Sequence, residues 1–420
     1  MNMSKLKVLS VSCAFVRLLA LAGCADETGA VEVPDTSADA GASTDGDGGS
    51  PPFETEQDGG ASDADAAPDR RISWDSGADE RQPIVQDAWT RSGVYCARVQ
   101  RGQDVTTKCW GSNRNGELGR GVVSTFGTTY APQPIQSPDA PHFTMVKPDI
   151  SLKGVVCGVL DTNDLKCWGV GYATGSPAVP SVPATPFLQD VRAVDVGANH
   201  ACAIKTDGKL LCWGGNRDGQ LGIGKQDSVT YPTPEEVPGI TVDQVVTGPR
   251  ATCAVSNGEV WCWGYKPLTG TGSGGGFVTS PTRAGTLTNI KKVHVNQSYA
   301  YAIGNDGSVW FWGVLGSKVS YTPAPFSDPT PEDPARSMTG VVDGIDDCFL
   351  FESGKVRCVE TTGGYRLTEV LRVDRAKKLT GKCVVSKDDE LLCWGNNTAG
   401  VLAESPTLLG SASGAIKIDL

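Results

Sequence analysis

The chain contains few of the residues that carry most enzyme chemistry. Only 3 histidines and 4 methionines occur among its 420 residues, and no two cysteines have the Cys-x-x-Cys spacing. Three histidines leave little material for a zinc site or for a histidine-based triad. A Gly-x-Ser-x-Gly elbow and a phosphate-binding glycine loop are also missing. We therefore expect no metal, no other cofactor and no catalytic residues.

A basic excess is missing as well, since the formal net charge is −11. Nucleic-acid binding relies on clustered lysine and arginine, so we expect no nucleic-acid partner. The chain does have 14 cysteines and 52 glycines. So many cysteines without metal-binding spacing indicate an oxidising compartment, outside a reducing cytosol.

The first 23 residues have the pattern of an export signal. Lys5 and Lys7 precede a mostly apolar run, Val8–Ala22, which is too short and too interrupted for a membrane span. The run ends in Leu21-Ala22-Gly23-Cys24, which resembles the lipobox of bacterial lipoproteins. The resemblance implies cleavage after Gly23 and acylation of Cys24, hence an envelope protein held at the outer membrane, on its periplasmic side or at the cell surface. An ordinary secretory signal is the alternative.

Residues 24–90 are predicted to be an acylated, disordered tether. Residues 25–90 hold 17 acidic residues and 3 arginines, with abundant Ala, Gly, Ser and Pro. Such a composition cannot bury enough apolar surface to offset chain entropy, and like charges extend the segment. A calcium-binding interpretation is not favoured, because the Asp/Gly run lacks the spacing of a calcium loop. Outside this tether and the signal, basic and acidic residues balance at 31 of each.

From residue 91 onward the chain repeats a short pattern. Cys-Trp-Gly recurs with a period of roughly 47 residues, which is typical of solenoids and propellers. Each copy follows a turn such as Asp207-Gly208 or Asn257-Gly258, with strand-like residues on both sides. Each repeat should therefore contain a β-hairpin. The copies begin at Cys109, Cys167, Cys212, Cys262 and Cys393, with Phe311-Trp312-Gly313 and Cys358-Val359-Glu360 as variants.

Loop length and cysteine spacing change together in these hairpins. A three-residue loop places Cys202 opposite Cys212, and a two-residue loop places Cys253 opposite Cys262. Directly opposed residues are close enough for a disulfide. Tyr301 and Phe311 take the equivalent positions in the fifth repeat, which favours a stapling role over metal binding. The spacing thus predicts six disulfides: Cys96–Cys109, Cys157–Cys167, Cys202–Cys212, Cys253–Cys262, Cys348–Cys358 and Cys383–Cys393.

The segment Gly214–Gly224, with Asn216, Gly219, Leu221 and Gly222, resembles the repeat of regulator of chromosome condensation propellers. Similar segments begin at Gly111 and Gly395. The resemblance implies an all-β fold over residues 91–420, a seven-bladed β-propeller of four-stranded blades. Each tryptophan, facing away from its own disulfide, should pack against a neighbouring sheet. We expect the terminal strand Ala415–Leu420 to complete the first blade and close the ring.

The resemblance also implies protein binding through one propeller face, whereas fold likeness alone carries no activity. Loops on a rigid scaffold commonly bind partners. We therefore expect an unknown protein or an envelope polymer as partner, a monomeric propeller, and membrane contact through the lipid anchor only. The alternatives are a lyase or hydrolase with its site at the central channel and a passive coat component. Three long insertions, 121–143, 266–286 and 316–338, offer the aromatic interface candidates Tyr130, Phe277, Tyr321 and Phe326.

Overall fold

The propeller lies in the compact unit Asp75–Leu420. In the computed structural model the described residues are 82–123, 128–136, 142–148, 154–170, 182–183, 186–326, 338–360, 366–397, 402 and 411–420. The predicted signal, Cys24 and the tether up to residue 81 lie outside these residues. Within the described residues, no helix is long and apolar enough to span a membrane.

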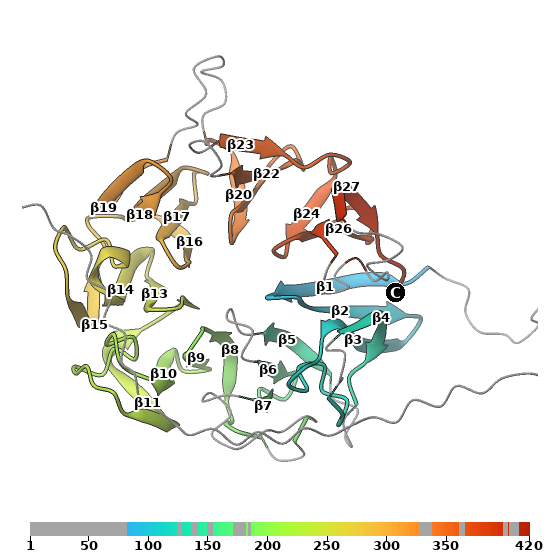
Figure 1. Cartoon of the computed structure of the whole chain (residues 1–420), viewed down its shortest axis with the longest axis horizontal. Helices are drawn as coiled ribbons and strands as arrows, with labels where there is room; N and C mark the ends of the chain where they lie inside the picture. Colours follow the sequence, from blue (N-terminus) through green and yellow to red (C-terminus); the bar gives the residue numbers. More distant parts are fainter. Residues whose placement is uncertain are drawn as a thin grey trace, which may run out of the picture. The chain divides into compact units, whose positions relative to one another are not determined.

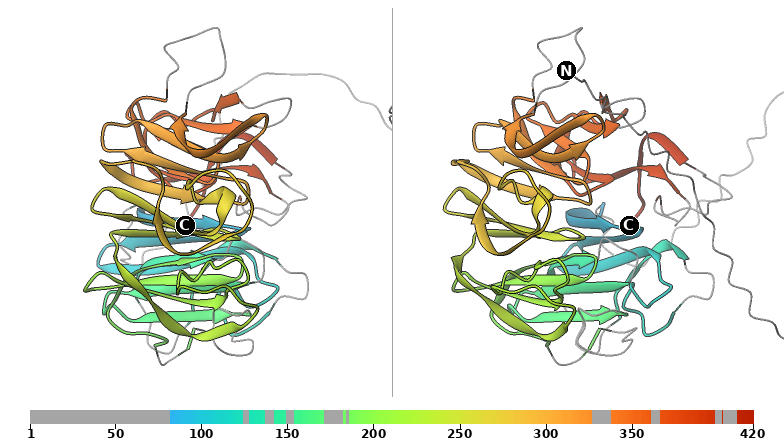
Figure 2. Two further views of the ribbon diagram at one scale, coloured as in Figure 1. Left: turned by 90° about the vertical axis from the view of Figure 1, so that its left-hand side faces the viewer. Right: turned by 60° about the vertical axis from the view of Figure 1, so that its left-hand side comes forward.

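Seven antiparallel sheets are arranged as blades around a central axis (Figures 1 and 2). The chain builds each blade from the centre outward, so neighbouring strands in a sheet are consecutive in sequence. The innermost strands of blades 1 to 7 are β1 (Ile84–Arg91), β5 (Phe143–Pro148), β8 (Val191–Val196), β12 (Gln244–Thr247), β16 (Ile290–Val295), β20 (Val341–Ile345) and β24 (Ala376–Leu379).

The second and third strands form the hairpin of each blade. The second strands are β2 (Val94–Arg101), β6 (Val155–Leu160), β9 (His200–Lys205), β13 (Ala251–Ser256), β17 (Tyr299–Gly304), β21 (Cys348–Phe351) and β25 (Cys383–Ser386). The third strands are β3 (Asp104–Ser112), β7 (Leu165–Gly169), β10 (Lys209–Gly215), β14 (Glu259–Tyr265), β18 (Val309–Leu315), β22 (Val356–Glu360) and β26 (Leu391–Asn396).

Outermost strands are described in six blades; blade 2 has three described strands. They are β4 (Thr128–Pro134), β11 (Thr230–Thr241), β15 (Phe277–Arg283), β19 (Lys318–Pro325), β23 (Arg366–Glu369) and β27 (Ser411–Lys417). A short 3₁₀ helix, η2 (Lys266–Leu268), follows β14. Three of these strands lie inside segments predicted to be loops, so much of each insertion serves as the outer edge of a blade.

The hairpins and their disulfides are confirmed. Cys202 pairs with Cys212 across a turn in which Gly208 has φ +87°, and Cys253 pairs with Cys262 across Asn257-Gly258, where both φ angles are positive. All six predicted cysteine pairs are bonded, with Cα–Cα distances of 3.9 to 4.1 Å. The opposed residues of the fifth hairpin are Tyr301 and Phe311, as the spacing predicted.

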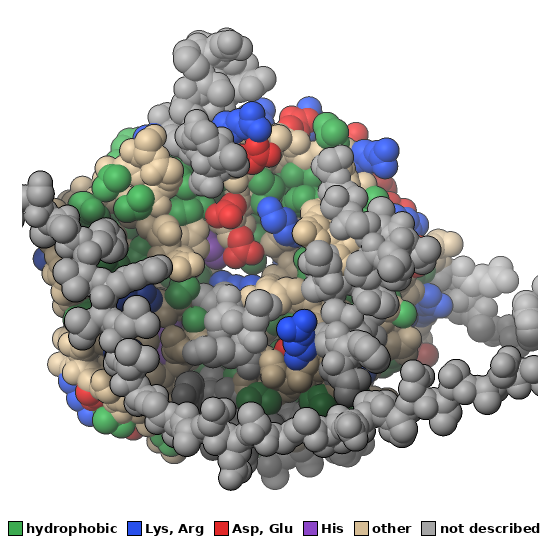
Figure 3. All heavy atoms as spheres, viewed as in Figure 1, with side chains coloured by type: hydrophobic (Ala, Val, Ile, Leu, Met, Phe, Trp, Pro, Cys, Tyr) green, Lys and Arg blue, Asp and Glu red, His purple; other side chains and the backbone are tan. Residues whose placement is uncertain are grey.

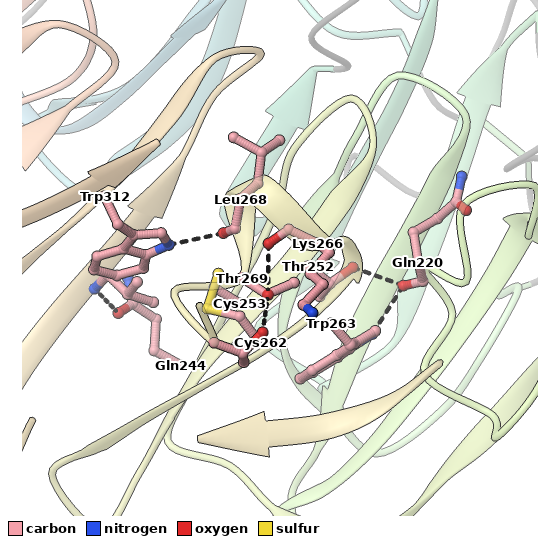
Figure 4. Close-up of a disulfide and its surroundings, with 12 residues drawn as sticks. Gln220, Gln244, Thr252, Cys253, Cys262, Trp263, Lys266, Leu268, Thr269 and Trp312 are labelled. Atoms are coloured by element: carbon pink, nitrogen blue, oxygen red, sulfur yellow. Dashed lines mark hydrogen bonds between the residues drawn. A yellow bond between two sulfur atoms is a disulfide. The ribbon is translucent and has the colours of Figure 1, made fainter. Parts of the chain in front are cut away.

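Each tryptophan of the repeat packs on the disulfide of the preceding blade. Figure 4 shows this for blades 4 and 5, where Trp312 lies beside Cys253–Cys262 and donates its indole N–H to Leu268 O at 2.8 Å. The other five indoles belong to equivalent clusters with the cysteines of the blade before them. One face of a blade therefore supplies sulfur and the next supplies an aromatic ring, so neither face is stable alone.

The asparagine of the repeat segment organises the loop after the third strand. Asn216 Oδ1 accepts the Leu221 N–H at 3.2 Å, and its Nδ2 donates to Lys225 O at 3.0 Å. This fold presents Gln220 O to the Trp263 indole N–H at 2.9 Å and to the Thr252 hydroxyl at 2.8 Å. Blade 4 has no such segment, and η2 supplies the carbonyl of Leu268 in its place.

The ring closes between blades 1 and 7, but not by the predicted route. The terminal strand β27 pairs with β26 and completes blade 7, whereas blade 1 obtains its innermost strand β1 from residues 84–91. The expected latch at Ala415–Leu420 is therefore wrong, and the boundary at residue 91 is too late. Val85, Ala88 and Trp89 are buried, which gives this segment the apolar pattern of a strand despite its acidic surroundings.

Candidate functional site

One end of the central channel opens into a cavity of about 820 Å³. Turns between the first and second strands of several blades supply most of its walls, and Figure 3 shows acidic and basic side chains around a central hollow. We call this cavity the channel mouth. It is lined by Arg91, Ser92, Pro249, residues 294–299, residues 314–316, Asp346, Asp347 and Lys382.

Blades 5 and 6 place a hydrogen-bonded carboxylate in the mouth. The Tyr299 hydroxyl donates to Asp347 Oδ1 at 2.6 Å, and Asn296 Nδ2 donates to the same oxygen at 3.4 Å. Asn296 Oδ1 in turn accepts the backbone N–H groups of Ser298 and Tyr299, both at 2.9 Å. Burial, followed by the charge of Asp347, raises the pKa of Tyr299 well above its ordinary value, so the hydroxyl stays protonated.

His294 lies in β16 between the mouth and the interior of the channel. Its imidazole stacks on Tyr301 with ring centroids 5.2 Å apart, and its side chain is 4% exposed. Burial and the nearby charges of Arg91 and Lys292 lower the pKa of His294 to about 3. The ring is therefore neutral near pH 7. Its Nε2 lies 3.6 Å from Asp346 Oδ1, which is too long for a hydrogen bond.

Deeper in the channel, one buried carboxylate contacts three other blades and so joins four. Asp195 of β8 contacts Arg91 Nη1 at 3.2 Å and Lys147 Nζ at 3.7 Å. Its Oδ2 also accepts the backbone N–H and the hydroxyl of Thr247, at 2.7 and 2.8 Å. Burial opposes the charge of Asp195, but Arg91, Lys147 and the two bonds from Thr247 keep its pKa below the ordinary value.

These groups suit recognition better than proton transfer. General acid–base catalysis works best when the pKa lies near the operating pH, and the pKa of His294 and that of Tyr299 both lie far from it. Among the described residues there is no group of three or more His, Cys, Asp or Glu able to hold a metal ion. The mouth offers hydrogen-bond donors, acceptors and both signs of charge in a space large enough for a side chain or small ligand.

A partly apolar rim flanks the mouth on blades 4 and 5. Arg250 lies 3.7 Å from the ring centre of Tyr265 and forms a two-point ion pair with Asp218, at 2.8 and 3.1 Å. Phe277 is the first residue of β15 and Val319 is the second residue of β19, so both lie at this end of their blades. Their side chains are 41% and 53% exposed. Val314, the partner of Val319 in the sheet, is 40% exposed and lines the mouth.

The four predicted interface aromatics have different positions. Phe277 is exposed on this rim, and Tyr321 is half-buried in β19. Tyr130 is a residue of β4. Phe326 is only 6% exposed, because it packs with Phe311 and Phe349 between blades 5 and 6. The prediction of Phe326 as an interface residue is therefore wrong. The Pro-rich sequence around it is typical of a loop and gave no sign that the side chain lies in the core.

Sequence reasoning did not identify the channel residues. Arg91, Asp195, His294 and Asp347 come from different blades, and no linear spacing joins them. A signal was available in the repeat itself. In blades 1 to 6 one residue of the innermost strand lies opposite the first cysteine position of the hairpin, and Lys147, Asp195 and His294 occupy it in blades 2, 3 and 5. Ionisable residues at a repeated, centrally placed position indicate the lining of a channel.

The comparisons agree with this geometry. Residues 191–220 and 207–255 match the model of the regulator of chromosome condensation (RCC1) repeat, and they contain His200, the Asn216 segment and the Cys202–Cys212 disulfide. Residues 191–255 are thus similar to the RCC1 repeat. His200 links two blades, since its Nε2 lies 2.7 Å from the Thr252 hydroxyl in the next blade.

Solved RCC1-like propellers share the fold at low identity. Prp20p from Saccharomyces cerevisiae, whose structure was reported with its binding to Gsp1p and histones, is 15% identical, with a TM-score of 0.59 over 81% of this chain and 86% of that chain. Human WBSCR16 is 16% identical, with a TM-score of 0.51 over 81% and 83%. These likenesses show that the chain has an RCC1-like propeller fold.

Curated relatives match over part of their length. The E3 ubiquitin-protein ligase HERC2 from Homo sapiens is 25% identical over 245 residues, covering 54% of this chain and 5% of the relative. The ultraviolet-B receptor UVR8 from Arabidopsis thaliana is 30% identical over 144 residues, covering 32% of each. This chain spans a third or less of the curated relatives it matches.

Proposed function

We propose that this protein is an exported lipoprotein whose RCC1-repeat propeller binds a protein or an envelope polymer through the face that carries the channel mouth. The observation that supports the proposal is the mouth itself, a polar cavity of about 820 Å³ beside an apolar rim. A pocket flanked by exposed aromatic and aliphatic side chains is the usual form of an interface centre. The opposite face is the natural control surface.

The test uses the compact unit Asp75–Leu420 as bait. The affinity tag belongs at the N-terminus, because Arg101 Nη2 donates to the carbonyl of the C-terminal Leu420 at 2.6 Å. We expect the bait to retain a discrete partner from solubilised envelope. The rim variants Phe277→Ser and Val319→Glu should lose that partner without loss of folding, since both side chains are already exposed.

A matched control is available on the opposite face. Leu371 is 60% exposed and follows the outer strand β23, which ends at the other side of the blade. Leu371→Ser should keep the partner at the wild-type level. If Leu371→Ser lost the partner and the rim variants kept it, the partner would bind the opposite face and the proposal would be wrong. Wild-type levels of the partner on all variants would also contradict the proposal.

The export part of the proposal depends on Cys24 at the end of the lipobox-like segment. Acylation there would anchor the chain, and the acidic tether would separate the propeller from the membrane surface. In the source cell, the wild-type chain should fractionate with membranes and incorporate labelled palmitate. Cys24→Ser should lose the label, and a labelled Cys24→Ser chain would exclude this anchor.

A further inference from the structure

A second cavity lies inside the channel, next to the mouth. It has a volume of about 250 Å³ and shares Arg91 and His294 with the mouth. Its other walls come from the innermost strands of blades 2, 3, 4 and 5, and include Met145, Val194 and Val245. We call it the inner cavity. Its size suits a group of a few heavy atoms.

Cations dominate the buried part of the inner cavity. Arg91, Lys147 and Lys292 line it, and Arg91 and Lys147 share the single carboxylate of Asp195. Lys292 has its own ion pair with Asp343. Asp243 is the other acidic lining residue, but it is exposed and accepts the Asn257 N–H at 2.9 Å. Two cations thus face one buried carboxylate.

Two nitrogens in the cavity wall are buried without a partner. Arg91 Nε and His294 Nε2 have no hydrogen bond among the described residues, although their side chains are only 8% and 4% exposed. A buried guanidinium N–H normally finds an acceptor, because an unsatisfied charged donor is costly. Burial lowers the pKa of Lys147, against the opposing charge of Asp195, and the charges of Arg91, Lys292 and Lys378 lower it further.

We propose that the inner cavity binds a small free carboxylate, held by Arg91, Lys147 and the neutral ring of His294. A carboxylate can accept two hydrogen bonds from the planar donors of a guanidinium. It would also supply a second negative charge, so that Arg91 and Lys147 no longer share Asp195 alone. The site is independent of the partner-binding proposal, because a small anion fills the inner cavity whether or not the propeller face is occupied. It resembles the existing Asp195 contact, with a ligand in place of a side chain.

Acetate is the probe, and the soluble chain 24–420 carrying Cys24→Ser is the protein. The midpoint of thermal unfolding should rise with acetate and saturate, and the dissociation constant follows from that curve. Lys147→Met should weaken acetate binding about tenfold or more, since a charge-assisted contact is lost. Lys355→Met is the control, because Lys355 pairs with Glu369 at the surface and does not line the inner cavity. It should bind acetate like the wild type.

Asp195→Asn gives an effect of the opposite sign. Removing the competing carboxylate should tighten acetate binding and make the stabilisation by acetate larger than in the wild type. This variant carries the test if Lys147→Met does not fold. An unsaturated rise that is equal in all variants would overturn the proposal, since it would be a general salt effect. Equal stabilisation by chloride at matched ionic strength would overturn the assignment to a carboxylate.

Discussion

A few buried side chains at the centre of the propeller determine how it responds to pH. Burial lowers the pKa of His200 to about 4 and that of His294 to about 3, whereas an unfolded histidine titrates near 6.5. Between these values the unfolded chain binds more protons than the folded one. Stability is therefore highest above about pH 6.5 and falls as the pH decreases toward 4.

We predict that His200→Gln and His294→Gln each flatten this pH dependence. In the wild type the two histidines together contribute a slope of up to about 2.7 kcal/mol per pH unit, and each variant should lose about half of it. The measurement is the free energy of unfolding in urea at several values between pH 4.5 and 7.5. His142 is exposed, so His142→Gln is the control. An unchanged slope in both buried variants would contradict the prediction.

At the interface between blades 5 and 6, larger side chains on one side compensate for a smaller side chain on the other. Tyr301 and Phe311 replace the disulfide of blade 5, and Val359 of blade 6 replaces the tryptophan that would pack on it. All three lie in one cluster and are 1%, 2% and 9% exposed. Larger residues on one side of the interface therefore compensate for the smaller one opposite, which keeps the packing density of the ring.

This compensation predicts that substitutions on the two sides have non-additive effects on the free energy of unfolding. Val359→Trp alone should overpack the interface and destabilise by about 1–3 kcal/mol. Tyr301→Cys with Phe311→Cys should leave a cavity and cost about 3 kcal/mol or more before the gain from a new disulfide. The triple variant should be more stable than the sum of these effects by about 1 kcal/mol or more. Chemical denaturation under oxidising conditions measures each free energy, and strict additivity would exclude the compensation.

At the scale of the element, the glycine of Cys-Trp-Gly permits a bulge between the third and fourth strands. The sheet register shifts between Cys212 and Gly214, and the same shift occurs in blades 1, 4, 5 and 7. Gly214 has φ +104°, and a Cβ there would lie 2.5 Å from Asn199 O. Blade 6 has Glu360 at this position, and its register between β22 and β23 is regular. The bulge therefore requires the glycine.

Gly214→Ala should destabilise the propeller by about 2–4 kcal/mol, because it adds a steric clash to an unfavourable backbone angle. The neighbouring Gly215 is the matched control. A Cβ at Gly215 would lie 3.4 Å from Asn199 O, an ordinary contact. Gly215→Ala should change stability by less than about 1 kcal/mol. Thermal unfolding of the two variants decides, and equal losses would mean that the bulge geometry is not the cause.

The elements that sequence reasoning found are those with local signals. Cysteine spacing and turn residues define the hairpins, because both act within about ten residues. The outer strand β15 was not predicted, because its strand conformation depends on pairing with β14 and the Gly- and Thr-rich segment before it has the composition of a loop. The channel was missed for a different reason. Arg91, Asp195 and His294 meet only when the ring is closed, and their contacts depend on the rotation from blade to blade rather than on nearby sequence.

At the scale of the whole molecule, the propeller depends on a strand from the end of the acidic segment. Val85 donates its backbone N–H to Asp389 O at 3.0 Å, and Asp87 pairs with Lys378 at 2.5 Å, so β1 joins blade 7 along its length. Val85 and Ala88 also lie in the same hydrophobic cluster as Cys383 and Leu391. These contacts span nearly the whole propeller, so closing the ring requires pairing between residues far apart in sequence.

A chain that begins at residue 92 should therefore fail to close. It would lack Arg91 and leave Asp195 with a weaker set of partners, and it would expose the apolar surface that Val85 and Trp89 cover. We expect aggregation or a broad, low-temperature unfolding transition, whereas the chain from Asp75 should elute as a folded monomer. Size-exclusion chromatography and calorimetry distinguish the two. A monomeric residue-92 chain with the same unfolding midpoint would contradict this prediction, because it would mean that the three remaining strands of blade 1, β2 to β4, are enough to close the ring against blade 7.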